Sequence, residues 1–170
     1  MWHLDNNATD TSSGGVNGTV TGATFDGANE QFGTHALSFD GTDDYVSAAL
    51  PDQTMQYSVA CWVYPDSSGT GRGRLFGRST SWYVEYDFDG NTTYFGQATD
   101  QNTVENSSAS NLESGWHHIA LTYDGANLRL YVDGTNVQTQ SQGGQPLNTG
   151  SFRIGTVDDN TNDFKGWIDD

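Results

Sequence analysis

The chain of 170 residues carries a formal net charge of −16, from 22 acidic and only six basic side chains, and Lys165 is its single lysine. Such a surface repels the phosphates of nucleic acids and the anionic headgroups of lipids, which excludes nucleic acids as partners and argues against a polybasic membrane contact. An aromatic content of 12 % excludes a disordered acidic tail, and every apolar run is shorter than the roughly 18 residues of a membrane span.

The length fits one domain, expected to cover residues 1–170. Short apolar or alternating runs are separated by Gly, Asp and Asn clusters at intervals of roughly 8–12 residues, which predicts an all-β sandwich or barrel with almost no helix. Asp-Gly dipeptides that begin at positions 89, 124 and 133 lie between several of these runs and favour tight antiparallel turns. The expected strands are residues 36–39, 45–47, 57–64, 75–78, 82–88, 93–98, 116–123, 128–132, 137–140, 151–155 and 164–168.

Alternation along two of these strands sorts their side chains into faces, because successive residues of a strand point to opposite sides. Cys61 falls on an apolar face and is therefore predicted to be a small buried residue. Tyr83, Glu85 and Asp87 share one polar face, which predicts that this side of their strand meets solvent. Trp62 and Trp116 lie in strands with core-like patterns, so they are interpreted as packing residues.

Several sequence blocks resemble the concanavalin A-like, laminin-G-like domains of secreted microbial proteins. They include GTHALSFDGTDDYV at 33–46, CWVYP at 61–65, WHHIALTYDG at 116–125, RLYVDG at 129–134, and FKGWIDD at 164–170. The blocks follow the order of the family and span nearly the whole chain. The resemblance implies a jelly-roll sandwich of two curved antiparallel sheets.

The resemblance also implies a non-catalytic module, often carbohydrate-binding or adhesive, that is attached to larger extracellular proteins. We therefore expect a glycan or cell-surface polysaccharide as partner and an extracellular or cell-surface location, although the first five residues lack the features of a signal peptide. The family pattern continues beyond Asp170 through a further strand that this sequence lacks, and residues 2–4 lie where the first strand would run. Trimmed terminal strands would favour dimer contacts.

Four side chains are candidates for binding a glycan. Tyr83, Glu85 and Asp87 offer a stacking ring and hydrogen-bonding groups on one face, and Arg78 on the neighbouring strand is expected to reach the same face. The alternative is that these are ordinary solvated side chains. A structural spacer without a small ligand is the second functional hypothesis, because a fold does not by itself specify a ligand.

A third hypothesis is a glycoside hydrolase of the β-glucanase type. Related jelly-roll glycosidases carry three acids at alternate positions of one strand, and this pattern resembles Glu85, Asp87 and Asp89. Two carboxylates on one face can lie about 5–5.5 Å apart, as retaining hydrolysis requires. Asp89, however, is one methylene shorter than the family's glutamate and precedes Gly90, so we expect it in a turn and assign no catalytic residue.

Calcium is the expected cofactor, because hard cations prefer carboxylate and carbonyl oxygens. Asp5 and Asp169 would lie at the same end of paired terminal strands, and Asp40 opens an acid-dense turn. These three residues form the predicted metal site, with an Asx turn as the alternative role of Asp40. The acidic segment 158–163 also resembles a calcium loop, but Asp163 occupies the position that needs glycine, so a variable hairpin loop is the better interpretation.

Overall fold

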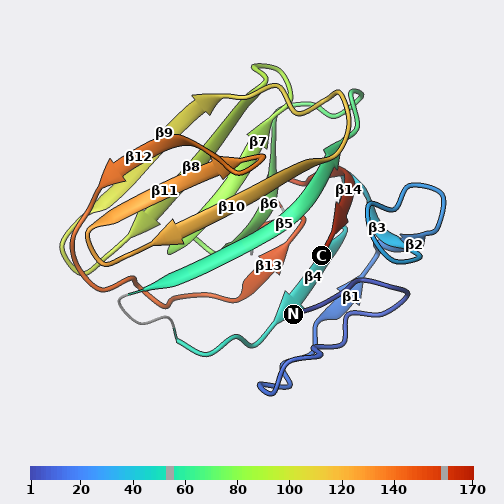
Figure 1. Cartoon of the computed structure of the whole chain (residues 1–170), viewed down its shortest axis with the longest axis horizontal. Helices are drawn as coiled ribbons and strands as arrows, with labels where there is room; N and C mark the ends of the chain where they lie inside the picture. Colours follow the sequence, from blue (N-terminus) through green and yellow to red (C-terminus); the bar gives the residue numbers. More distant parts are fainter. Residues whose placement is uncertain (53–55, 158–160) are drawn as a thin grey trace.

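Two antiparallel sheets face each other in the computed structural model, which describes residues 1–52, 56–157 and 161–170 (Figure 1). The first, called here the β7 sheet, has the order β1 (Thr19–Thr21), β4 (Tyr45–Ala48), β13 (Phe152–Ile154), β6 (Arg72–Arg78), β7 (Trp82–Asp87), β8 (Thr92–Ala98) and β9 (Thr103–Ala109). The second, the β5 sheet, has the order β12 (Thr135–Ser141), β11 (Asn127–Val132), β10 (His117–Tyr123), β5 (Tyr57–Pro65), β14 (Lys165–Asp169), β3 (Ala36–Asp40) and β2 (Thr24–Asp26).

The predicted fold class is confirmed: the described residues form two sheets of seven strands, with no helix among them. The elements described contain no helix long and apolar enough to cross a membrane. All of the expected strands are present, with boundaries shifted by up to three residues. Three further strands, β1, β2 and β9, were not expected.

The core fills the space between the two sheets because the alternating residues of each strand point inward. Trp82, Val84 and Tyr86 of β7 are fully buried, and Ile119 and Leu121 of β10 are buried from the opposite sheet. Cys61 is buried as predicted, and desolvation raises the pKa of its thiol.

Trp62 and Trp116 pack against neighbouring aromatic rings, as interpreted, but neither belongs to the buried core between the sheets. Trp62 stands directly opposite His118 in the β5–β10 pairing, on the side away from the buried Cys61 and Val63, and it is partly exposed. Its ring contacts His118 at 5.3 Å between centroids, and the ring of Trp116 contacts that of Tyr64 at 5.9 Å. Aromatic rings therefore cover part of the outer surface of the β5 sheet.

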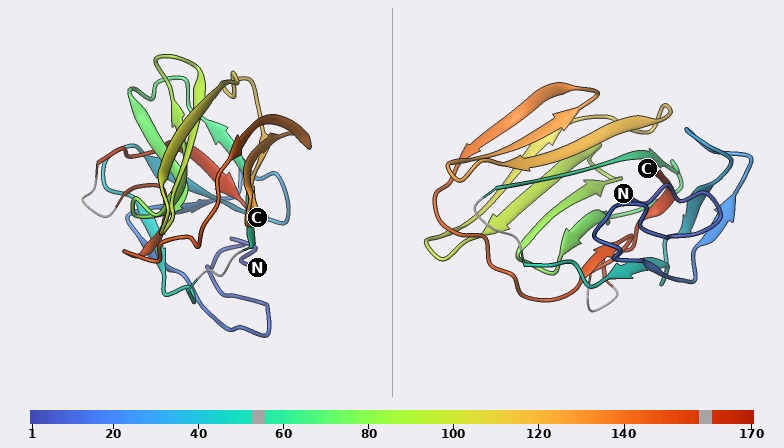
Figure 2. Two further views of the ribbon diagram at one scale, coloured as in Figure 1. Left: turned by 90° about the vertical axis from the view of Figure 1, so that its left-hand side faces the viewer. Right: turned by 60° about the horizontal axis from the view of Figure 1, so that its bottom comes forward.

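The N-terminal segment does not form a strand paired with β14. Trp2 makes an isolated antiparallel bridge with Asp10, and its indole packs against Phe152 of the β7 sheet at 5.7 Å between ring centroids. The two chain ends lie near each other, because the His3 ring is hydrogen-bonded to the Asp170 carboxylate at 3.2 Å (Figures 1 and 2).

Candidate functional site

The outer surface of the β7 sheet carries a group of charged and aromatic side chains that we call the polar face. Its members come from four adjacent strands, β6 to β9, and are Arg72, Arg74, Tyr83, Glu85, Tyr94 and Glu105. Register explains why they meet, because directly opposed residues of antiparallel strands share a side of the sheet. Arg74, Glu85 and Tyr94 form one such row, and Tyr83 and Glu105 flank Gly96 in the next.

A buried ion pair forms the base of the polar face. Nε and Nη2 of Arg74 both donate to Oε1 of Glu85, at 3.0 and 2.8 Å, and Nη1 of Arg74 donates to the Ser79 carbonyl at 2.8 Å. Asn162 adds a third donor to the same Glu85 oxygen at 2.9 Å. Because both charged side chains are only 4 % exposed, the pair is held in one geometry by several charge-assisted hydrogen bonds.

Two tyrosine rings stand above this base, and both are partly exposed. The Arg72 guanidinium lies 3.5 Å from the centre of the Tyr94 ring, and its Nη1 is 3.5 Å from Oε2 of Glu105. The Tyr83 hydroxyl donates to Oε2 of Glu105. Burial and the Glu105 carboxylate both raise the pKa of Tyr83, so it remains a neutral phenol that can donate a hydrogen bond at physiological pH.

A glycine makes room for one of these rings. A Cβ atom at Gly96 would come within 2.7 Å of the Tyr83 ring, so the ring can lie across β8 only because this position has no side chain. Tyr83 can then reach Glu105 on β9. The polar face thus combines flat apolar ring surfaces with fixed hydrogen-bonding groups, which is the combination that recognises small polar molecules with apolar faces.

Of the four predicted ligand-binding residues, the structure brings Tyr83, Glu85 and Asp87 to the outer surface of one strand. Arg78 does not join them. It stands opposite the buried Trp82, and its guanidinium donates to the Gly150 and Pro51 carbonyls at 3.1 and 3.2 Å. The expectation that Arg78 shares the face of Tyr83 is therefore wrong.

The reason is a register shift in β6 between Arg74 and Phe76, which breaks the strict alternation. Leu75 and Phe76 are consecutive and both buried, so every later residue of β6 changes sides. Arg72 and Arg74 face outward in place of Arg78. The sequence signal that could have indicated this is the pair of adjacent large apolar residues inside an otherwise alternating strand.

The other two acids of the alternating triplet serve the turn after β7. Oδ1 of Asp87 accepts the backbone N–H groups of Asp89 and Gly90 at 3.1 and 3.2 Å, and Oδ2 of Asp89 accepts that of Gly71 at 3.2 Å. The strand ends at Asp87. Asp89 therefore lies in the turn, where its sequence context predicted it.

The three residues of the predicted calcium site do not lie together. Asp40 stands opposite Lys165 at the start of β14, whereas Asp169 ends that strand, so four residues separate the two positions by roughly 13 Å. Asp40 is instead grouped with Asp43 and Asp44, with carboxylate oxygens within 4.8 Å of one another.

Asp5 and Asp169, by contrast, bind the same loop. Asp5 accepts the N–H groups of Thr34 and His35 at 2.5 and 3.1 Å, and Asp169 accepts those of Gln31 and Phe32 at 3.0 and 2.9 Å. Asp169 is completely buried, and desolvation raises the pKa of its carboxyl group. The carboxylate oxygens of Asp5 and Asp169 are the kind of ligand that a hard cation prefers. Asp40 lies elsewhere and would not share such an ion.

The second acidic loop that resembles a calcium loop includes residues 158–160, which lie outside the described residues.

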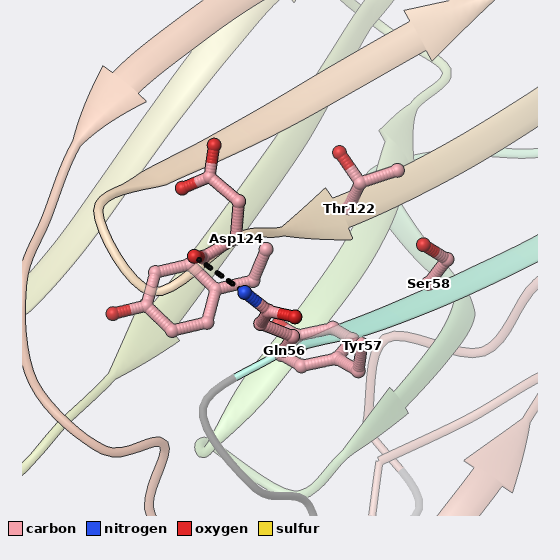
Figure 3. A pocket seen from close by; sticks show the side chains of 6 residues that line it. Gln56, Tyr57, Ser58, Thr122 and Asp124 are labelled. Carbon is pink, nitrogen blue, oxygen red and sulfur yellow. Dashed lines mark hydrogen bonds between the residues drawn. The ribbon is translucent and has the colours of Figure 1, made fainter.

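A separate open hollow of about 350 Å³ lies where β5 begins and β10 ends (Figure 3). Gln56 donates to the Asp124 carbonyl across it at 3.3 Å. The Asp124 carboxylate already accepts from Arg129, Ala126 and Asn127, and these hydrogen bonds, led by the one from Arg129, lower its pKa to about 2. The Asp124 carboxylate therefore stabilises its own turn. The polar face carries more charged and aromatic side chains than this hollow, so it is the stronger candidate for a binding site.

Two facing antiparallel sheets of seven strands define a jelly-roll sandwich of the concanavalin A type. The chain belongs to the concanavalin A-like lectin/glucanases superfamily, whose family model matches residues 40–170. No curated protein sequence matches the chain.

Solved structures with the same fold include carbohydrate-binding and laminin G domains. Domain 4 of AbnA, an extracellular GH43 arabinanase from Geobacillus stearothermophilus, was solved with arabinotriose; it is 24 % identical, with a TM-score of 0.74 over 99 % of this chain and 86 % of that one. The carbohydrate-binding module CBM66 from Bacillus subtilis is 15 % identical, with a TM-score of 0.55 over 90 % and 92 % of the two chains. Domains LG4-5 of the mouse laminin alpha1 chain are 14 % identical, with a TM-score of 0.63 over 79 % and 41 %.

Proposed function

We propose that this chain is a non-catalytic carbohydrate-binding or adhesion module of an extracellular protein, and that its glycan binds on the polar face. The observation that carries the proposal is the placement of two partly exposed tyrosine rings beside fixed arginine and glutamate side chains. Sugar rings have apolar faces that stack on aromatic rings and hydroxyl groups that hydrogen-bond to charged side chains. The binding roles of the AbnA domain and of CBM66 support the same assignment.

The contacts of the strand acids favour binding over hydrolysis. Oε1 of Glu85 accepts three hydrogen bonds, two of them from Arg74, so the carboxylate is neutralised by a buried cation. Hydrolysis would need two carboxylates that are free to reach the scissile bond, but Asp87 and Asp89 accept backbone N–H groups of Asp89, Gly90 and Gly71. If Glu85 nevertheless acted in hydrolysis, β-glucans would release reducing sugar, and Glu85→Gln would abolish the release.

The glycan proposal is tested by affinity electrophoresis and a glycan array with Tyr94→Ala and Arg72→Ala. We expect each variant to weaken binding roughly tenfold, because about 1–2 kcal/mol of ring or charge contact is lost. Tyr131→Ala is the matched control, since Tyr131 is a partly exposed tyrosine in β11 of the other sheet. Equal loss in all three variants contradicts the placement on the polar face. A wild-type protein that retains no glycan contradicts the function and favours the structural spacer.

Calcium remains a proposal for the end of the molecule where Asp5 and Asp169 bind the loop at 31–35. The ion would offset the charge of the buried Asp169 and of its neighbour Asp170, and it would fasten this loop to both ends of the chain. We expect millimolar Ca²⁺ to raise the melting temperature and a chelator to lower it, because a ligand of the folded state stabilises that state. Asp5→Ala should remove the calcium response, whereas Asp40→Ala should retain it. An unchanged melting temperature at millimolar Ca²⁺ would rule the site out.

A further inference from the structure

Six aromatic side chains gather on the outer surface of the β5 sheet, and we call them the aromatic face. They come from β5, β14, the start of β10 and the loop between β2 and β3, and are Phe32, Trp62, Tyr64, Trp116, His118 and Trp167. Each ring contacts at least one other, with centroids between 5.3 and 5.9 Å apart, and each residue is at least partly exposed. Contiguous exposed rings on a soluble protein indicate a surface that binds a ligand or partner.

Strand register places the rings in two rows. Trp62 stands opposite His118 on β10, and Tyr64 stands opposite Trp167 on β14, while the ring of Trp116 contacts Tyr64 from the β10 side. The rows are two residues apart along β5, or roughly 7 Å, and together they cross three strands, or about 10 Å. A ligand of several linked rings can therefore contact more than one aromatic side chain at once.

Phe32 is fixed beside Trp62 by a buried carboxylate. Asp169 stands opposite Trp62 and accepts the N–H groups of Gln31 and Phe32 at 3.0 and 2.9 Å. Asp169 is completely buried, whereas Phe32 remains 48 % exposed. Burying a carboxylate is unfavourable unless hydrogen bonds compensate for the lost hydration. These hydrogen bonds therefore do more than close a loop, because they also hold an exposed ring in one position, as a binding site requires.

Carboxylates flank the aromatic face on two sides. Oδ2 of Asp26 accepts the indole N–H of Trp167 at 2.8 Å, and Oδ1 of Asp133 accepts the backbone N–H of His118 at 2.9 Å. Hydrogen bonds, led by the one from Asn29, lower the pKa of Asp26 below 3.8, so its carboxylate is ionised at neutral and mildly acidic pH. The face therefore combines electron-rich ring faces with ionised carboxylates, and both attract cations.

The basic residues of the protein do not offset these carboxylates. Lys165 stands opposite Asp40, and Arg129 donates to the Asp124 carboxylate at 2.5 Å. The other four arginines belong to β6 and β13 of the β7 sheet. In a protein of net charge −16, an anionic ligand or a second copy of this chain is repelled, whereas a cationic ligand is attracted.

We propose that the aromatic face binds a polymer of amino sugars. The apolar C–H faces of its sugar rings pack on the aromatic rings, and its protonated amines lie near the ring faces and the flanking carboxylates. A lysine-rich peptide carries similar charge, but its flexible stems offer no flat surface to the rings and lose more entropy on binding. The site does not depend on glycan binding at the polar face, which lies on the outer surface of the other sheet.

The test measures binding of the β-1,4-linked glucosamine hexamer by calorimetry at pH 5.5, where its amines are protonated. The N-acetylglucosamine hexamer has the same backbone without the charge, and hexalysine has the charge without the sugar rings. We expect saturable binding of the glucosamine hexamer, at least tenfold tighter than that of either control, and weaker binding in 0.5 M NaCl. Equal binding of hexalysine, or of the acetylated hexamer, would overturn the proposal.

Variants locate the bound hexamer. Phe32→Ala and Trp62→Ala should each weaken binding roughly tenfold, because each removes a ring from the aromatic face. Tyr45→Ala is the matched control, since Tyr45 is a partly exposed tyrosine in β4 of the other sheet. Circular dichroism checks that the variants are folded, and the exposed position of Phe32 makes its substitution the less disruptive of the two. Binding that Phe32→Ala and Trp62→Ala leave intact but Tyr94→Ala abolishes would place the hexamer on the polar face and overturn the proposal.

Discussion

Carboxylates in this protein act mainly as acceptors for nearby backbone N–H groups. Asp10 is the clearest example: it accepts from the N-terminal ammonium group at 2.8 Å and from the backbone of Ser12 and Val16 at 2.8 and 2.9 Å. These hydrogen bonds, led by the one from the N-terminus, lower the pKa of Asp10 far below 3.8. Hydrogen bonds of this kind explain how many acids are accommodated with few basic partners.

Asp10 should make the N-terminal segment sensitive to acid. Its folded-state pKa is depressed, so its stabilising contribution is complete above the unfolded value near 3.8 and is lost as the pH falls toward the folded value. We expect Asp10→Asn to melt at a lower temperature than the wild type at pH 6, with a smaller difference at pH 2.5. Glu30→Gln, at an exposed acid, is the control and should show no such convergence. A difference that grows on acidification would contradict this role.

Individual residues also show how much of the candidate site can be predicted from the sequence. Tyr83, Glu85 and Asp87 were predicted to share a face by alternation, because β7 itself alternates strictly and pairs regularly with β8, while the irregularity lies in the facing strand β6. Sequence reasoning did not find Arg72, Tyr94 and Glu105. These residues come from three other strands, and the pattern within a single strand does not show how strands align with one another. The placement of Asp5 and Asp169 rested on a pairing of the two terminal strands, whereas β14 pairs with β3 and β5, and Asp169 lies at its end, four residues along the strand from the partner of Asp40.

At the scale of elements, the absence of a side chain at Gly73 lets β6 approach the segment around Phe164 closely. A Cβ atom there would lie 2.7 Å from the Cα of Phe164 and 3.0 Å from the ring of Phe88. Phe164 is completely buried and directly precedes β14. Gly73 therefore allows β6 of one sheet to contact the segment that leads into β14 of the other.

Gly73→Ala should lower the free energy of unfolding by about 1–3 kcal/mol, the usual cost of overpacking a core. The nearest atom is backbone, which cannot rotate away. Gly90→Ala is the control, because the new Cβ would meet its neighbours at 3.4 Å or more, an ordinary contact. Urea unfolding of both variants measures the difference. Equal stabilities would show that β6 and Phe164 can move apart freely.

Elements differ in how far their sequences predict them. The long strands were predicted, because burial of one face imposes an alternating pattern on their residues. β9, with the sequence TVENSSA, has Val104 as its only residue packed against the core and lies at a sheet edge, so its sequence shows little apolar alternation. β1 and β2 contain three residues each, too few to establish a period of two.

At the scale of the whole molecule, the excess of negative charge opposes the compact state. The carboxylates are spread over turns and both chain ends, and only five arginines and one lysine offset them. Repulsion between them is long-range, so it is weakened when salt shortens the screening length from about 30 Å at 0.01 M to about 3 Å at 1 M.

Raising NaCl from 0.01 to 1 M should therefore increase the melting temperature by about 2–4 °C for each kcal/mol of repulsion relieved. KCl should produce the same shift at equal ionic strength, which separates screening from specific cation binding. Differential scanning calorimetry provides the measurement. A decrease in melting temperature would mean that attractive ion pairs, such as Arg72 with Glu105, dominate the charge balance.

The scarcity of lysine has a practical consequence for attaching the protein to a surface. The single lysine of residues 1–170, Lys165, stands opposite Asp40 in the β5 sheet. It does not belong to the polar face. Amine-directed coupling to a sensor chip or bead should therefore leave Tyr83 and Tyr94 unmodified and accessible, so the immobilised protein can be used directly to measure glycan capture.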